Sequence, residues 1–169
     1  MKSTDKILSL PKLLDQITDW RGQGQKIVFT NGCFDILHSG HVSYLNRAKE
    51  LGDVLIVGIN CDESVGRLKG ADRPINTVAD RMEVLSGLSS IDHLISFGHE
   101  TEDSPVEIIR AAKPRIYVKG GDYTVETLPE AKVVEEVGGD IVFVPYVPDH
   151  STTRIIHRIN KSIPLKQPA

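Results

Sequence analysis

Five short runs of apolar residues recur along the chain, at 26–31, 54–59, 91–97, 115–118 and 141–144. The run at 54–59 is apolar at nearly every position rather than at alternate positions, which is typical of a strand covered by helices on both faces. We therefore expect five buried β-strands that pair in parallel.

Between these runs, apolar residues recur at the three- and four-residue spacing of amphipathic helices. Ser9 and Pro11 mark the start of the first helix, which is expected to pack on the domain or on a partner. Ser104 and Thr127 are each followed three residues later by a glutamate, which predicts two helices with capping boxes. The predicted helices cover 9–20, 42–51, 77–88, 104–112, 127–137 and 151–160.

Alternating strands and helices indicate the α/β class, in a Rossmann-like, doubly wound, five-stranded parallel sheet. With 169 residues, we expect a single domain at 25–160, preceded by an N-terminal helix at 1–24 and followed by a flexible tail at 161–169. A strand order of 3-2-1-4-5 would place the ligand site between the first and fourth strands.

Composition narrows the functional class. The net charge of −3 argues against a protein that coats nucleic acid or binds a membrane surface. No run approaches the roughly 18 apolar residues of a membrane span, and the first residues lack the apolar core of a signal peptide. Cys33 and Cys61 form no C-x-x-C pair. We expect a cytoplasmic protein with reduced thiols.

The strongest chemical signal is the H-x-G-H turn of His38, Gly40 and His41, which connects the first strand to a helix start. Backbone N–H groups and the positive end of a helix dipole favour an anion there, so the turn predicts a phosphate site. A purely structural role for the histidines is the alternative. A zinc site lacks further ligands at a suitable spacing, and a serine hydrolase would need a G-x-S-x-G turn.

Three other segments would meet this turn. The loop at 60–76 carries Arg67, Lys69 and Arg73 among glycines, and predicts either a mobile cationic arm or a solvated surface loop. The segment at 119–123 follows the fourth strand. Hydroxyl side chains and an arginine at 151–154 open the last helix, and they predict either a polyphosphate site or a simple N-cap. Arg81 is expected on the surface of its helix. Structural roles are expected for His93, His99, His150 and His157.

The motifs at 32–35, 38–41 and 151–154 together resemble the H-x-G-H nucleotidyltransferase superfamily of cytidylyl- and adenylyltransferases. The segments at 73–76 and 119–123 are similar to those of adenylyltransferases that act on D-glycero-β-D-manno-heptose 1-phosphate. The resemblance covers 26–160. It implies transfer of AMP from ATP to heptose 1-phosphate, which gives pyrophosphate and ADP-heptose for lipopolysaccharide core synthesis. Such domains are often fused to a sugar kinase, and here a stand-alone form is expected.

The resemblance also implies roles for individual residues. The catalytic residues would be His38, His41 and Lys69, and the substrate phosphate would contact Asp35 and Arg73. The nucleotide-binding set would be Thr30, Asn31, Gly32, Cys33, Phe34, Gly40, Lys119, Gly121, Asp122, Ser151, Thr152, Thr153 and Arg154. Many superfamily members have threonine where Cys33 stands, so a hydroxyl contact is not carried over to it. Mg²⁺ would be held mainly by substrate oxygens and water.

Other functions stay open at this stage. One is a cytidylyltransferase acting on glycerol 3-phosphate or a phospho-alcohol, and another is a nucleotide-binding domain without turnover. A class I tRNA synthetase fragment would need a K-M-S-K-S stretch that the chain lacks. The sugar and its anomer, the base and the oligomeric state are left open, with a homo-oligomer as one option.

Overall fold

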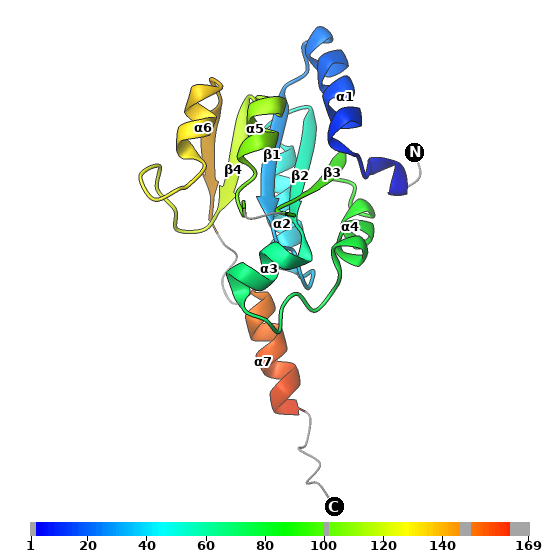
Figure 1. The fold of residues 1–169 in the computed structure, drawn as a ribbon, viewed down its shortest axis with the longest axis vertical. Helices are drawn as coiled ribbons and strands as arrows, with labels where there is room; N and C mark the ends of the chain where they lie inside the picture. The colour runs from blue at the N-terminus through cyan, green and yellow to red at the C-terminus, as the bar shows by residue number, and fades with distance from the viewer. Residues whose placement is uncertain (1–2, 100–101, 146–149, 163–169) are drawn as a thin grey trace, which may run out of the picture.

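The computed structural model describes residues 3–99, 102–145 and 150–162. A β-sheet lies at the centre, and helices cover both of its faces (Figure 1). The strands are β1 (Ile27–Gly32), β2 (Val54–Asn60), β3 (His93–Phe97), β4 (Ile116–Gly120) and β5 (Asp140–Val144). All neighbouring strands pair in parallel, in the order β3-β2-β1-β4-β5. The predicted fold class and strand order are confirmed.

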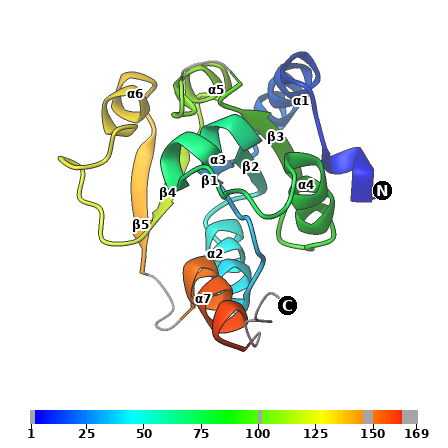
Figure 2. The same cartoon turned by 60° about the horizontal axis from the view of Figure 1, so that its bottom comes forward.

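The helices alternate with the strands, except that α3 and α4 both lie between β2 and β3, and a short 3-10 turn η1 (Ser3–Lys6) precedes the first helix. They are α1 (Leu10–Gly22), α2 (Ser39–Lys49), α3 (Asp62–Lys69), α4 (Val78–Ser86), α5 (Val106–Ala112), α6 (Ala131–Glu136) and α7 (Thr152–Ser162). Figure 2 shows α1, α5 and α6 on one side of the sheet and α2 and α7 on the other. None of the helices described is both long and apolar enough to cross a membrane.

Two apolar cores fill the space between the sheet and its helices. Phe29 contributes to the core under α1, α5 and α6, whereas its neighbour Val28 contributes to the core under α2 and α4. This alternation follows from the two-residue period of a strand. A sheet buried on both faces explains why the strand runs are continuously apolar.

The N-terminal helix belongs to this packing. Leu13 and Ile17 of α1 are buried in the first core, and the Trp20 ring lies 4.8 Å from the ring of His93 on β3. This helix was expected to pack either on the domain or on a partner protein, and the structure shows it packed on the domain. Of the tail predicted at 161–169, the first two residues close α7 and the rest lies outside the described residues.

The prediction of a long loop at 60–76 is wrong for its first half, because this part of the chain forms α3. Cys61 caps this helix, because its Sγ accepts from the Ser64 N–H at 3.4 Å. Acidic residues occupy the first turn and basic residues the last, as the helix dipole favours. The helix has only eight residues and contains Gly66, which is why its pattern is typical of a loop.

The two predicted capping boxes are also wrong. The Ser104 hydroxyl has no partner within the described residues, and α5 starts without a side-chain cap. Thr127 instead bonds Thr124, and the Glu130 carboxylate pairs with Lys119 on β4. Long-range contacts have replaced the local bonds that the S/T-x-x-E pattern suggests.

We predict that Leu13→Ala lowers the free energy of unfolding by about 3 kcal/mol, because it leaves a cavity between α1 and the sheet. Urea denaturation measures this change. Lys12→Ala, on the exposed side of the same helix, is the matched control and should change stability by less than about 0.5 kcal/mol. Equal effects of both variants would mean that α1 does not depend on this packing.

Candidate active site

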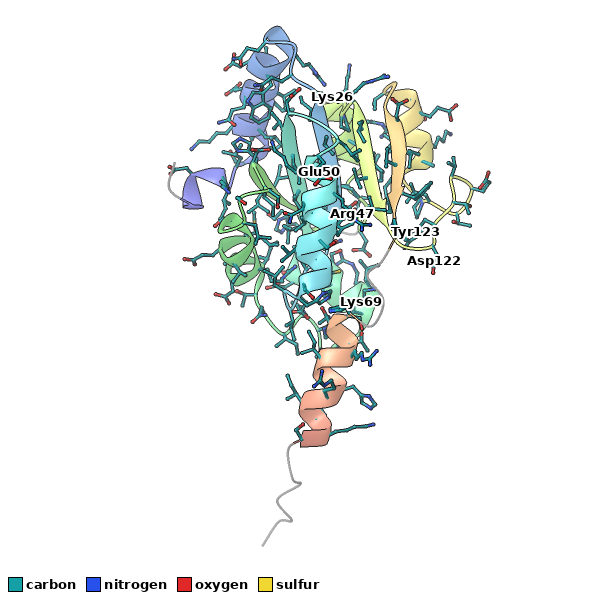
Figure 3. The ribbon with its side chains drawn as sticks, turned by 180° about the vertical axis from the view of Figure 1, so that it is seen from behind. Lys26, Arg47, Glu50, Lys69, Asp122 and Tyr123 are labelled. Carbon is teal, nitrogen blue, oxygen red and sulfur yellow. The ribbon has the colours of Figure 1, made fainter. Side chains whose placement is uncertain are left out.

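A cavity of about 930 Å³ opens at the carboxyl ends of β1 and β4, where the strand order reverses. Ligands of doubly wound sheets bind at this point. The end of α3 and the start of α7 also line it, and Figure 3 shows Lys69 near the start of α7. The residues assigned to substrates from sequence that line it are His38, His41, Lys69, Asn31, Gly32, Cys33, Phe34, Gly40, Lys119, Ser151, Thr152, Thr153, Arg154, Asp35 and Arg73.

Three assigned residues are not among the described residues that line the cavity: Thr30, Gly121 and Asp122. Thr30 is fully buried beneath it, where its hydroxyl lies 2.6 Å from the Tyr44 hydroxyl. Asp122 lies on the outer loop after β4 (Figure 3). Nucleotide contacts of these residues therefore stay predictions from sequence.

The H-x-G-H turn is held by the histidines themselves. Nδ1 of His38 accepts from the His41 backbone N–H at 3.4 Å, so His38 is the N-cap of α2. The two rings stack with their centroids 3.7 Å apart. A Cβ on Gly40 would lie 3.0 Å from the His38 ring and from the His150 Cβ, so a larger residue would force both neighbours to shift. Both rings thus stand at the positive end of a helix dipole.

Both histidines are neutral at pH 7. Burial, with a smaller effect of His38, lowers the pKa of His41 to about 4. Burial and His150 lower the pKa of His38 as well. Since Nδ1 of His38 accepts a hydrogen bond, its proton sits on Nε2. The turn therefore offers neutral N–H donors, together with backbone N–H groups, to a phosphate.

Asp35 holds the basic segment that follows α3. Its carboxylate is 3% exposed, and it accepts from Arg73 Nε at 2.6 Å and from the backbone of Ile75 and Asn76 at 2.9 Å. Burial acts to raise the pKa of Asp35, but these hydrogen bonds hold it below its ordinary value. The carboxylate is thus occupied by the protein, and it presents Arg73 to the cavity.

Arg81 is an important residue that the sequence analysis placed wrongly. It is fully buried rather than on the surface of α4. Its guanidinium donates to the carbonyls of Cys33, Asn60 and Asn76 at 2.5, 2.8 and 3.0 Å and to the Asp62 carboxylate at 2.7 Å. It therefore joins the loop after β1, the end of β2 and the start of α3 to the segment just before α4. Only these long-range partners reveal its position, and the sequence carries no local signal for it.

The start of α7 closes another side of the cavity. Ser151 Oγ accepts from the Arg154 backbone N–H at 3.2 Å and caps the helix. Thr152 Oγ1 donates to the Ile36 carbonyl at 3.3 Å, which ties α7 to the loop before the H-x-G-H turn. His150, for which a structural role was expected, lines the cavity with its ring centroid 6.4 Å from that of His38. Two helix N-termini thus meet at one cavity.

The opposite wall has different chemistry. The Tyr117 hydroxyl donates to Asn31 Oδ1 at 2.6 Å, and the Lys119 ammonium pairs with Glu130 at 3.1 Å. Glu130, 4% exposed, lines the cavity, and sequence reasoning assigned it to helix capping. Its one visible signal was the same S/T-x-x-E pattern.

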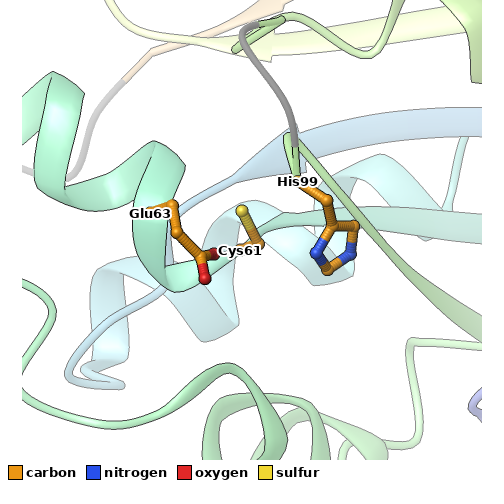
Figure 4. Close-up of side chains that lie close together, drawn as sticks. All are labelled: Cys61, Glu63 and His99. Carbon is orange, nitrogen blue, oxygen red and sulfur yellow. The ribbon is translucent and has the colours of Figure 1, made fainter.

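Within the described residues, one group could hold a metal ion through three side chains. Cys61, Glu63 and His99 place their ligand atoms within 4.8 Å of one another (Figure 4). None of them lines the cavity, and the Cys61 thiol already donates to the Gly98 carbonyl at 2.8 Å. The cavity walls thus contain no such group in the part of the chain that the structure describes.

Comparison with known proteins assigns the chain to a family. The model of the cytidylyltransferase-like family matches residues 29–158. The bifunctional protein HldE of Pseudomonas paraeruginosa is 50% identical over 92% of this chain, and that of Marinomonas sp. is 51% identical over 91%. In each case the match covers 32% of the relative, so the chain spans about a third of the length of these proteins.

Solved structures agree with this assignment. The lipopolysaccharide core biosynthesis protein from Thermoplasma volcanium is 30% identical, with a TM-score of 0.59 over 73% of this chain and 98% of that one. Pantothenate synthetase from Thermus thermophilus has a TM-score of 0.60 at 14% identity, over 84% of this chain and 62% of that one. The second likeness concerns the fold alone.

We predict that the His41 imidazole titrates near pH 4 in the folded protein, because burial disfavours its charged form. NMR of ring carbons labelled with ¹³C measures this value. The same protein unfolded in urea is the control, with histidines near 6.5. Since the folded value is the lower one, this group removes stability as the pH falls from about 6.5 toward 4. A folded value near 6.5 would contradict the description of the turn.

We predict that Asp35→Asn lowers the free energy of unfolding by about 3 kcal/mol at pH 7, because it leaves Arg73 and two N–H groups with a weaker acceptor. The lowered pKa of Asp35 stabilises the fold above the unfolded value near 4, and this contribution is lost as the pH falls through the folded value. Urea titrations from pH 7 to 3 should therefore show the difference shrinking. The control is Asp72→Asn on the exposed neighbouring loop, which should have the same free energy of unfolding as the wild type across this pH range.

Proposed function

Since the chain belongs to the cytidylyltransferase-like family, we propose that it transfers AMP from ATP to D-glycero-β-D-manno-heptose 1-phosphate. The products are pyrophosphate and ADP-heptose, for lipopolysaccharide core synthesis. The observation that carries this proposal is the neutral His38–His41 pair at the start of α2, which lines one cavity together with the start of α7. The relative described as a lipopolysaccharide core biosynthesis protein supports the pathway.

The chemistry is a direct displacement at phosphorus. An oxygen of the sugar 1-phosphate forms a bond to the α-phosphorus of ATP, and the bond from that phosphorus to the oxygen bridging to the β-phosphate breaks. Pyrophosphate leaves with the electron pair of that bond. No covalent enzyme intermediate forms, so the protein acts by positioning the groups and stabilising charge.

Each side chain then has a defined task. His41 and His38 donate to the phosphate oxygens on which charge develops, and Gly40 lets the backbone approach them. Lys69 and Arg73 stabilise the leaving pyrophosphate or the incoming phosphate, and Asp35 fixes Arg73. The N–H groups at the start of α7 bind the β- and γ-phosphates, together with Thr152, Thr153 and Arg154.

Mg²⁺ bound with ATP would neutralise part of the phosphate charge. Asp35 and Glu130 are already paired with Arg73 and Lys119, so the residues present fit an ion held mainly by phosphate oxygens and water rather than by the protein. A hard cation that keeps its water needs few protein ligands when phosphate oxygens are present. We therefore propose ATP with Mg²⁺ and a sugar 1-phosphate as the substrates.

We predict that His41→Ala lowers kcat by at least about 10²-fold, because it removes a donor aimed at developing charge. Pyrophosphate release from ATP and heptose 1-phosphate measures the rate. His157→Ala, on an exposed position of α7, should leave the rate unchanged. A His41→Ala enzyme that keeps its fold and its kcat would contradict the mechanism.

The same assay tests the substrates. ATP, CTP, GTP and UTP are each paired with heptose 1-phosphate, glycerol 3-phosphate and phosphopantetheine. Turnover of ATP with heptose 1-phosphate is the expected result. Turnover of CTP with glycerol 3-phosphate would indicate the cytidylyltransferase alternative instead.

A further inference from the structure

Four side chains form a hydrogen-bonded chain along one wall of the cavity. Glu130 Oε1 lies 3.1 Å from Lys119 Nζ, which lies 3.4 Å from the Tyr117 hydroxyl. That hydroxyl donates to Asn31 Oδ1 at 2.6 Å. Tyr117 is fully buried, whereas Asn31 and Lys119 line the cavity. The chain thus runs from a buried carboxylate to an amide at the exit of β1.

The chain has one direction. The Lys119 ammonium can only donate, so the Tyr117 oxygen accepts from it and gives its own proton to Asn31 Oδ1. Burial and the nearby Glu130 raise the pKa of Tyr117 well above its usual value, so the phenol keeps that proton. The remaining group of Asn31, its Nδ2, has no partner within the described residues and is left as a donor for the cavity.

The wall carries no net charge, because Glu130 neutralises Lys119 at 3.1 Å. The cationic groups that face the cavity from α3 and the following loop are Lys69 and Arg73, and the helix N-termini lie at α2 and α7. Phosphates are stabilised on that side. An uncharged wall with oriented N–H donors suits the oxygens of hydroxyl groups instead.

Glu130 has a further feature that fold stability does not explain. Its second oxygen, Oε2, is buried without a partner among the described residues, which is unfavourable for a carboxylate. The structure shows no capping role for Glu130, so the ion pair with Lys119 and the nearby Tyr117 hydroxyl are the side-chain interactions that keep it in place. A destabilising group retained beside a ligand cavity points to binding.

We propose that Asn31 and Lys119 bind hydroxyl oxygens of a substrate, and that Tyr117 and Glu130 are positioning residues that orient them. This subsite rests on the proposed function. It adds Tyr117 and Glu130, which were not assigned to the site from sequence. The proposed reaction has two sources of such hydroxyls, the acceptor sugar and the ribose of ATP.

The test compares Asn31→Ala, Tyr117→Phe and the double variant in the pyrophosphate-release assay. Each single change should raise the KM of one substrate by roughly fivefold to tenfold, with kcat changed by less than about threefold. The double variant should resemble Asn31→Ala, because Tyr117 acts through Asn31. A higher KM for heptose 1-phosphate identifies the sugar. A higher KM for ATP that 2′-deoxy-ATP does not share identifies the ribose.

Unchanged KM values for both substrates in Asn31→Ala would overturn the proposal, as would additive effects of the two changes. Asn31 lies at the cavity surface, so this variant decides the matter even where Tyr117→Phe lowers the melting temperature. A wild-type chain that releases no pyrophosphate from any pair would refute the proposed function alone. Calorimetry of heptose 1-phosphate, ATP and 2′-deoxy-ATP binding to wild type and Asn31→Ala then tests the subsite separately, and equal affinities would overturn it.

Discussion

The buried guanidinium of Arg81 is the interaction on which the site depends. A fully buried cation is strongly unfavourable unless it is hydrogen-bonded and paired, and here the guanidinium makes four hydrogen bonds, to three backbone carbonyls and one carboxylate. The carbonyls belong to Cys33, which follows β1, to Asn60, which ends β2, and to Asn76, which precedes α4. Loops that would otherwise move independently are therefore fixed to one another.

The groups proposed to bind phosphate are built outward from these fixed loops. Asp35 lies two residues after Cys33, and its carboxylate holds the segment that carries Arg73. The H-x-G-H turn follows Asp35 in the same loop. Thr152 ties α7 to the same loop through the Ile36 carbonyl. A reaction that proceeds by positioning needs its donors in place before substrate binds, and this succession of bonds supplies that order.

Much of the fold follows from local patterns, and the remainder depends on contacts between distant residues. Continuous apolar runs predicted five parallel strands, and the H-x-G-H turn and the hydroxyls before α7 predicted where the cavity lies. The pattern of α3 was too short to predict a helix around Gly66. Arg81 was misplaced because three of its four partners lie 19 to 48 residues away, and Glu130 because its partner Lys119 lies 11 residues away, whereas local signals favour a surface position and a helix cap.

The two walls of the cavity divide recognition by charge. Near Arg73 and the helix N-termini, donors and positive potential favour phosphate, and neutral histidines add N–H groups without needing a proton from solvent. Across the cavity, Glu130 cancels the charge of Lys119, so that wall does not compete for the phosphates. A substrate with a charged end and an uncharged, hydroxyl-bearing end is thereby oriented in one direction.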